Sequence, residues 1–136
     1  LYSLETHKIL LLQSEQAWSM LGGESCVGEK AEVAFARIVN KILNVNLKAK
    51  NIYPIYDYFH DGRDKINYVF YGEVKKPQKF SCLKEGSYCW VAFNETSKLP
   101  FTASTKQDVI VGERVISAKW RDDEASKLSA ISNVIL

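Results

Sequence analysis

The sequence predicts an α/β domain in which helices pack against a mixed β-sheet. Between residues 29 and 45, apolar side chains recur at steps of three and four residues, which is typical of a helix with one buried face. Before and after this segment lie short runs rich in β-branched and aromatic residues, which favour strands. Because a chain of 136 residues can bury enough surface for one such domain, we expect a single domain over residues 1–136.

The first predicted strand is the apolar run at residues 8–13, which is too short for a helix. The helix predicted at residues 29–45 ends near Asn44, a residue type that accepts a positive φ angle. At helical spacing, its apolar face would consist of Ala31, Phe35, Ile38, Ile42 and Val45.

Two further strands are predicted at residues 51–59 and 65–74, on either side of Asp61 and Gly62, a pair typical of hairpin turns. Another β-rich run follows at residues 88–93. The aromatic residues of the two hairpin strands could either pack in the core or offer a stacking surface for a base. They are Tyr53, Tyr56, Tyr58, Tyr68, Phe70 and Tyr71.

The C-terminal part of the chain predicts two helices. Ser104 and Thr105 are candidate N-caps for the first, which would continue to about Trp120 although Gly112 lies within it. A final helix is predicted from about residue 122 towards residue 136.

The composition excludes several classes of protein. Lysine and arginine total 18 and aspartate and glutamate 16, so the net charge of +2 is too small to indicate a nucleic-acid partner. The longest apolar runs fall far short of the roughly 20 residues that a membrane span needs, so no membrane partner is expected. Cys26, Cys82 and Cys89 form no metal-binding or disulfide pattern, and we expect reduced thiols in a cytoplasmic protein.

The most informative spacing joins Gly23, Glu29 and Arg37. Five residues separate the glycine from the glutamate, and seven separate the glutamate from the arginine. With apolar residues at Val39 and Val45, this pattern resembles the Nudix box, the signature of the Nudix hydrolase superfamily.

The sequence around the box also resembles that superfamily. WSMLGG stands directly before the box, and Glu85 is followed five residues later by Trp90. The resemblance implies an α/β/α sandwich with a mixed β-sheet. It also implies a pyrophosphohydrolase in which glutamates hold Mg²⁺ or Mn²⁺ against the substrate.

The departures from the box concern its metal ligands. Ile38, Lys41 and Ile42 stand where the superfamily has its three helix glutamates, and Asn44 stands where it has a glycine. These hard cations need oxygen ligands, which isoleucine cannot offer, and a lysine ammonium group would repel them. We therefore expect no cofactor, with Mg²⁺ or Mn²⁺ bound only if the chain is active.

The remaining box residues allow two interpretations each. Gly22, Gly23 and Glu24 would shape the loop. Glu29 is either a catalytic or metal-binding carboxylate or a first-turn glutamate that favours the helix dipole. Arg37 either braces a carboxylate or meets a phosphate.

Other charged residues could complete a site. Lys30, Arg37 and Lys41 share one flank of the predicted helix, which would form either a phosphate cradle or a solvated basic edge. Glu32 is a further candidate metal ligand, and Glu85 a further catalytic carboxylate.

Three functions follow from these features. The first is a non-catalytic or weakly active module that binds a nucleotide or another phosphate compound. The second is a metal-dependent hydrolase of a nucleoside diphosphate derivative. The third is a protein-interaction or sensor domain, in which an apolar helix flank would support a homodimer.

Overall fold

The computed structural model describes residues 1–59, 64–79 and 86–135, with side chains described up to residue 129. These parts of the chain form a five-stranded sheet in the order β3-β4-β1-β2-β5. Strand β1 is parallel to β4 and antiparallel to β2, and the pairs β2–β5 and β3–β4 are antiparallel, so the sheet is mixed as predicted. The strands are β1 (Tyr2–Ser3), β2 (Lys8–Leu12), β3 (Ile52–Phe59), β4 (Ile66–Val74) and β5 (Tyr88–Ala92).

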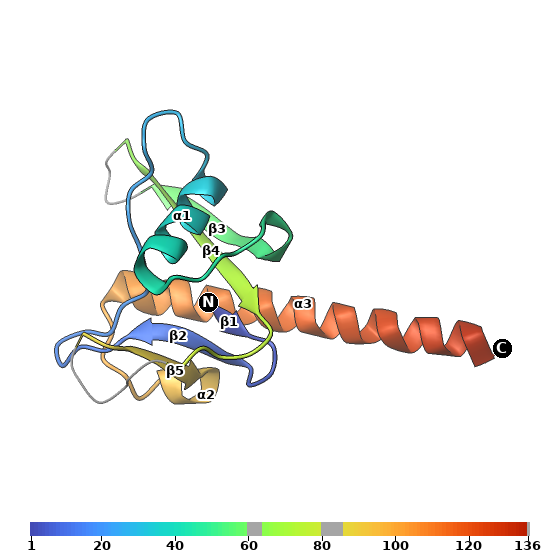
Figure 1. Cartoon of the computed structure of the whole chain (residues 1–136). Coiled ribbons are helices and arrows are strands. Elements are labelled where there is room, and N and C mark those ends of the chain that lie inside the picture. Colours follow the sequence, from blue (N-terminus) through green and yellow to red (C-terminus); the bar gives the residue numbers. More distant parts are fainter. Residues whose placement is uncertain (60–63, 80–85, 136) are drawn as a thin grey trace.

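Helices cover both faces of this sheet (Figure 1). Successive residues of a strand point to opposite faces, and on β2 Leu10 and Leu11 pack into different clusters. Leu10 packs with Val39 of helix α1 (Ala31–Leu43), and Leu11 packs with Val109 of helix α3 (Ala103–Ile135). The three layers therefore run α1, sheet, α3, which is the predicted α/β/α arrangement.

Helix α1 begins and ends two residues inside its predicted bounds. Asn44 follows it with φ 56°, and its N–H bonds to the carbonyl of Asn40, so the expected positive φ angle is confirmed. The helix buries Ala34, Val39 and Leu43.

The predicted apolar face of α1 is wrong at Ile42, which is 47% exposed. The chain that follows the helix explains this difference, because Val45 and Leu47 pack against the side of the last turn that carries Val39 and Leu43. Ile42 is left on the other side of that turn.

The C-terminal region forms one helix, so the prediction of two is wrong. Thr102 caps the helix by accepting a hydrogen bond from the N–H of Thr105 at 3.3 Å, in place of the predicted caps. Asp123 lies inside the helix, where its carboxylate meets the ammonium group of Lys119, one turn earlier, at 2.8 Å. No residue between 113 and 135 is a proline or glycine, and the helix continues beyond the sheet (Figure 1).

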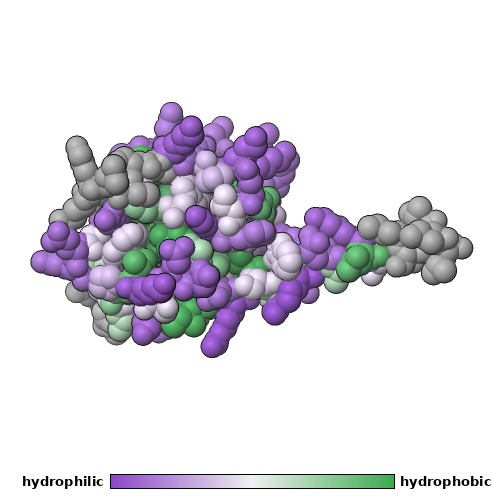
Figure 2. Space-filling view, turned by 90° about the horizontal axis from the view of Figure 1, so that it is seen from below, coloured by the Kyte–Doolittle hydropathy of each residue, from purple (hydrophilic) through white to green (hydrophobic). Residues whose placement is uncertain are grey.

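The part of α3 that stands clear of the sheet is mostly hydrophilic as far as its side chains are described, up to residue 129 (Figure 2). Leu128 is an exposed exception. Nearer its start, Gly112 is tolerated because the helix passes close to β3. A Cβ atom at this position would lie 3.3 Å from the Cδ1 atom of Ile55. Close packing thus explains why a glycine sits within this helix.

Three short elements were not predicted: β1, the 3-10 helix η1 (Ala49–Asn51) and helix α2 (Phe93–Thr96). The predicted strand at 88–93 ends at Ala92, since Phe93 already belongs to α2. The predicted hairpin pairing is confirmed from Ile52 opposite Gly72 to Phe59 opposite Ile66. Its predicted turn, Asp61 and Gly62, lies outside the described residues.

The shortness of β1 shapes the sheet. On this side β4 pairs with β1 only at Glu73 and Val74. Among the described residues, the earlier part of β4 therefore has a strand neighbour only in β3. The sheet is divided there, with β3 and β4 on one side and β2 and β5 on the other (Figure 1).

Candidate functional site

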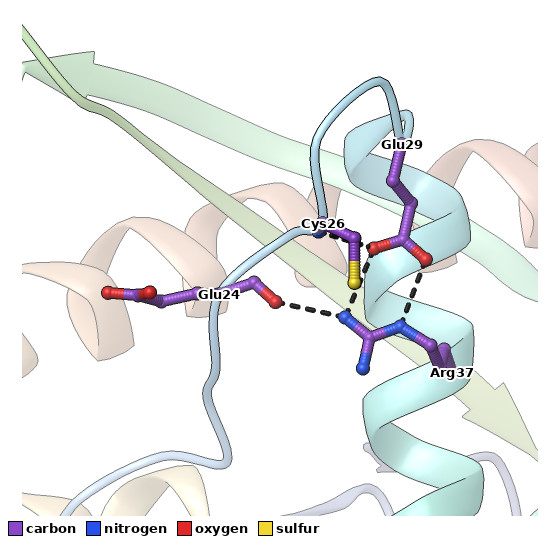
Figure 3. Close-up of polar contacts among 4 residues, drawn as sticks. All are labelled: Glu24, Cys26, Glu29 and Arg37. Atoms are coloured by element: carbon purple, nitrogen blue, oxygen red, sulfur yellow. Dashed lines mark hydrogen bonds and ion pairs between the residues drawn. The ribbon is translucent and has the colours of Figure 1, made fainter.

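The box loop (residues 22–30) is held to α1 by Arg37 (Figure 3). The Nε atom of Arg37 donates to Oε2 of Glu29 at 2.9 Å, and its Nη2 atom donates to Oε1 at 3.0 Å. The same Nη2 atom donates to the carbonyl oxygen of Glu24 at 2.9 Å. This two-pronged pairing fixes both ends of the loop to one side chain of the helix.

Glu29 accepts a further hydrogen bond from the N–H of Cys26 at 2.9 Å. The hydrogen bond from Arg37, and then that from Cys26, lower the pKa of Glu29 below its ordinary value. The carboxylate is therefore an anion whose acceptor sites are largely taken by its own loop and helix. This geometry matches the bracing interpretation of Arg37. The interpretation of Glu29 as a first-turn glutamate is wrong, because α1 begins at Ala31 and Glu29 precedes it.

Gly23 lies directly against Ile38. Ile38 is the first of the three residues that stand where the resemblance to the Nudix box implies a glutamate. A Cβ atom at residue 23 would come within 2.8 Å of the Cδ1 atom of Ile38. The loop can approach the helix this closely because residue 23 has no side chain. Further along the loop, Gly28 adopts φ 78°, a conformation that also favours glycine.

We call the hydrogen bonds of Arg37 to Glu29 and to the Glu24 carbonyl the brace. The other predicted charged residues do not take part in it. Lys30, Glu32 and Lys41 are exposed on or beside α1, and Glu85 lies outside the described residues. Within residues 1–59, 64–79 and 86–135, no group of three or more histidine, cysteine, aspartate or glutamate residues could hold a metal ion. The brace thus joins Glu29, Arg37 and the backbone of Glu24, and the described residues around it form no group of carboxylates that could bind a metal ion.

A groove of about 820 Å³ opens beside the box loop, where the sheet is divided. Its lining comes from residues 19–25, the first half of α1, Tyr58 of β3, the start of β4 and the N-terminal turns of α3. Of the predicted site residues, Gly22, Gly23 and Glu24 line it. Lys30, Arg37 and Lys41 are not among its described lining residues.

One wall of the groove is aromatic. The ring centroids of Phe35 and Phe70 are 5.6 Å apart, and the ring of Tyr68 stacks against Phe70 at 6.4 Å. Tyr68 is 48% exposed, whereas Tyr71 is buried in the core against Tyr53. Core packing is therefore confirmed for Tyr71, whereas Tyr68 and Phe70 stay candidates for a stacking surface.

A second wall of the groove is polar and centres on Asp108 of α3. Its Oδ1 atom accepts hydrogen bonds from the hydroxyls of Tyr56 at 2.6 Å and Tyr58 at 3.2 Å. The amide Nδ2 of Asn67 donates to the Tyr58 hydroxyl at 2.8 Å. Burial, and then the hydrogen bond to Asp108, raise the pKa of Tyr56, so its hydroxyl stays protonated and continues to donate.

Asp108 was not among the predicted site residues. The only signal in the sequence was a carboxylate in the second turn of a predicted helix, which is common. Its partners Tyr56 and Tyr58 lie 52 and 50 residues earlier in the chain. The site depends on this long-range packing.

No protein-family model matches the chain, and no curated protein matches it. The structure defines an α/β protein with a groove between an aromatic and a polar wall. In the described part of the chain, no helix is long and apolar enough to cross a membrane.

Proposed function

We propose that this protein is a Nudix-like module that binds a nucleoside or nucleotide in the groove without hydrolysing it. The observation that carries the proposal is the groove itself, which pairs an aromatic wall with a polar one directly beside the box loop. Its volume lies within the roughly 300–1,000 Å³ that is usual for small-molecule sites. Aromatic faces such as those of Tyr68 and Phe70 suit a planar base.

The brace supports a binding role over hydrolysis. Glu29 is already engaged by Arg37 and Cys26. Ile38 offers Mg²⁺ no oxygen and instead packs beneath Gly23. The metal-dependent hydrolase is the alternative, and it would need Glu29 to exchange Arg37 for a cation.

Cellular location and assembly belong to the same proposal. Cys26 and Cys89 form no disulfide, which suits a protein of the reducing cytoplasm. The exposed side chain of Ile42 favours α1 as the contact if the protein forms a homodimer or meets a protein partner. Sedimentation of the wild type beside Ile42→Ser tests that contact, and identical monomeric behaviour would count against it.

The test of binding is calorimetric titration with nucleosides and nucleotides, in EDTA and again with Mg²⁺. We expect the same affinity in both conditions. Tyr68→Ala should weaken binding by roughly tenfold or more, because base stacking on an aromatic ring is worth about 1–3 kcal/mol. Phe59→Ala is the matched control, since this aromatic residue is exposed on β3 and does not belong to the described groove lining.

Two results would overturn the proposal. Mg²⁺-dependent turnover that Glu29→Gln abolishes would establish the hydrolase. Failure of every nucleoside and nucleotide to bind would remove the proposed ligand class altogether.

A further inference from the structure

The described lining of the groove is acidic. It carries the carboxylates of Glu24, Asp64 and Asp108 against the single ammonium group of Lys65, a formal charge of −2. Lys65 lies 3.7 Å from the carboxylate of Glu24, so this cation already has an anionic neighbour. A phosphate group entering the groove would meet net repulsion.

The cations that were candidates for binding phosphate lie elsewhere. Arg37 is committed to Glu29 and to the carbonyl of Glu24. Lys30 and Lys41 are exposed and are absent from the described lining. Charge complementarity therefore favours a neutral or cationic ligand in the groove.

The polar wall offers hydrogen-bond acceptors to such a ligand. A carboxylate has about four acceptor positions, and the described donors to Asp108 are the single hydroxyl protons of Tyr56 and Tyr58. Asn67 uses its Nδ2 atom to donate to Tyr58, which leaves its Oδ1 atom as another acceptor. Asp108 is held in place by its tyrosine partners, so its orientation is set before a ligand arrives.

We infer that the groove binds the planar ring of a nucleoside or free base through its N–H groups, with Asp108 as the acceptor that selects the ring, and that it disfavours phosphate. This inference rests on the proposed function and narrows its ligand class. A flat ring can stack on the aromatic wall, and the N–H groups at its edge can donate hydrogen bonds to the acceptors of the polar wall. Nucleosides therefore bind at least as tightly as their 5′-phosphates.

The experiment uses matched ligands, so that it does not depend on any variant. Calorimetric titrations compare adenosine with purine riboside, which lacks the amino group, and guanosine with inosine, which lacks the 2-amino group. Each nucleoside is also compared with its 5′-monophosphate. We expect the amino-bearing member of at least one pair to bind about tenfold more tightly, since without that donor the bound ring covers an acceptor and leaves it without a hydrogen bond.

The Asp108→Asn variant tests the residue. It keeps the shape of the side chain but replaces one acceptor oxygen by a donor, so the preference for the amino-bearing ligand should disappear. Asp57→Asn is the matched control, because Asp57 is exposed on β3 and is absent from the described lining. Far-ultraviolet circular dichroism and thermal melts verify that both variants fold.

The outcomes separate the inference from the function beneath it. Equal binding within both pairs, or tighter binding of the 5′-monophosphates, would overturn the inference while leaving a nucleotide-binding module in place. An unchanged preference in folded Asp108→Asn would overturn the role of that residue. Failure of all these ligands to bind would overturn the proposed function as well.

Discussion

Glu29 and Asp108 are both carboxylates held by hydrogen-bond donors, but their donors come from different parts of the chain. The donors to Glu29 are Arg37 and Cys26, which belong to the same loop and helix. Asp108 receives its hydrogen bonds from Tyr56 and Tyr58 on a distant strand, and it also lines the groove. The segment with a recognisable motif thus acts as a brace, and the carboxylate that can meet a ligand lies in a segment without one.

The largest expected effect comes from adding carboxylates beside the brace, so that α1 can bind a metal ion. The triple variant Ile38→Glu, Lys41→Glu and Ile42→Glu places three carboxylates on the flank of α1 that carries Arg37. It replaces one positive charge by three negative ones, and Mn²⁺ prefers such oxygen ligands. Electron paramagnetic resonance should detect Mn²⁺ bound to the variant and none bound to the wild type. A folded variant that binds no Mn²⁺ would show that α1 is not positioned as in a metal-binding box.

The next effect tests whether Glu29 and Asp108 are held independently of each other. In Arg37→Ala, Glu29 loses both guanidinium bonds and the Glu24 carbonyl loses its donor. The box loop should open more often, and hydrogen exchange at the Cys26 amide should accelerate by roughly tenfold. Asp108→Asn should leave this rate unchanged, as should Glu32→Ala on the exposed face of the same helix. Acceleration in all three variants would mean that the loop and the groove open together.

A smaller effect measures the contact between the loop and α1. Gly23→Ala forces Ile38 to shift, because the added Cβ atom would lie 2.8 Å from a side-chain carbon of that residue. We expect a loss of about 1 kcal/mol in the free energy of unfolding, measured with urea. In the double variant with Ile38→Ala this loss should shrink, because the obstructing carbons are gone. Strict additivity of the two substitutions would contradict the contact.

The smallest effect concerns pH. Because the pKa of Glu29 is lowered in the folded protein, the brace contributes fully above the ordinary glutamate value of 4.5. Its contribution is lost only as the pH falls through the lowered value. Carbon-detected NMR of the Glu29 carboxyl group should therefore show a midpoint below 4.5, which Arg37→Ala moves upward. A midpoint at the ordinary value in the wild type would disprove the pairing in solution.

The sequence predicted the local features of this fold and missed those that depend on distant contacts. The periodicity of α1 and the positive φ angle at Asn44 are local, and both predictions were correct. The exposure of Ile42 depends on how Val45 and Leu47 fold back after the helix. No helical pattern contains that information.

The same distinction applies to the candidate site. Gly23, Glu29 and Arg37 were recognised because their spacing is fixed along one segment, and the structure brings Glu29 and Arg37 together. Asp108 became a candidate only when β3 brought two tyrosines to it. A carboxylate in a helix carries no sequence mark that separates a ligand contact from a solvated side chain.

The two residues of β1 have a mechanical consequence. Tyr2 and Ser3 are the strand residues that join the β3–β4 pair to the β2–β5 pair by backbone hydrogen bonds. Leu4 and Glu5 add bonds of 2.9 Å to Val74 and 3.1 Å to Lys75. The two strand pairs are therefore linked within the sheet by the short strand β1. The distance between the two strand pairs at the open end of the groove depends on this link and on the helices that pack over the sheet. The width available to a bound ring is thus set in part by β1, which pairs with the end of β4 opposite to the end that carries Tyr68.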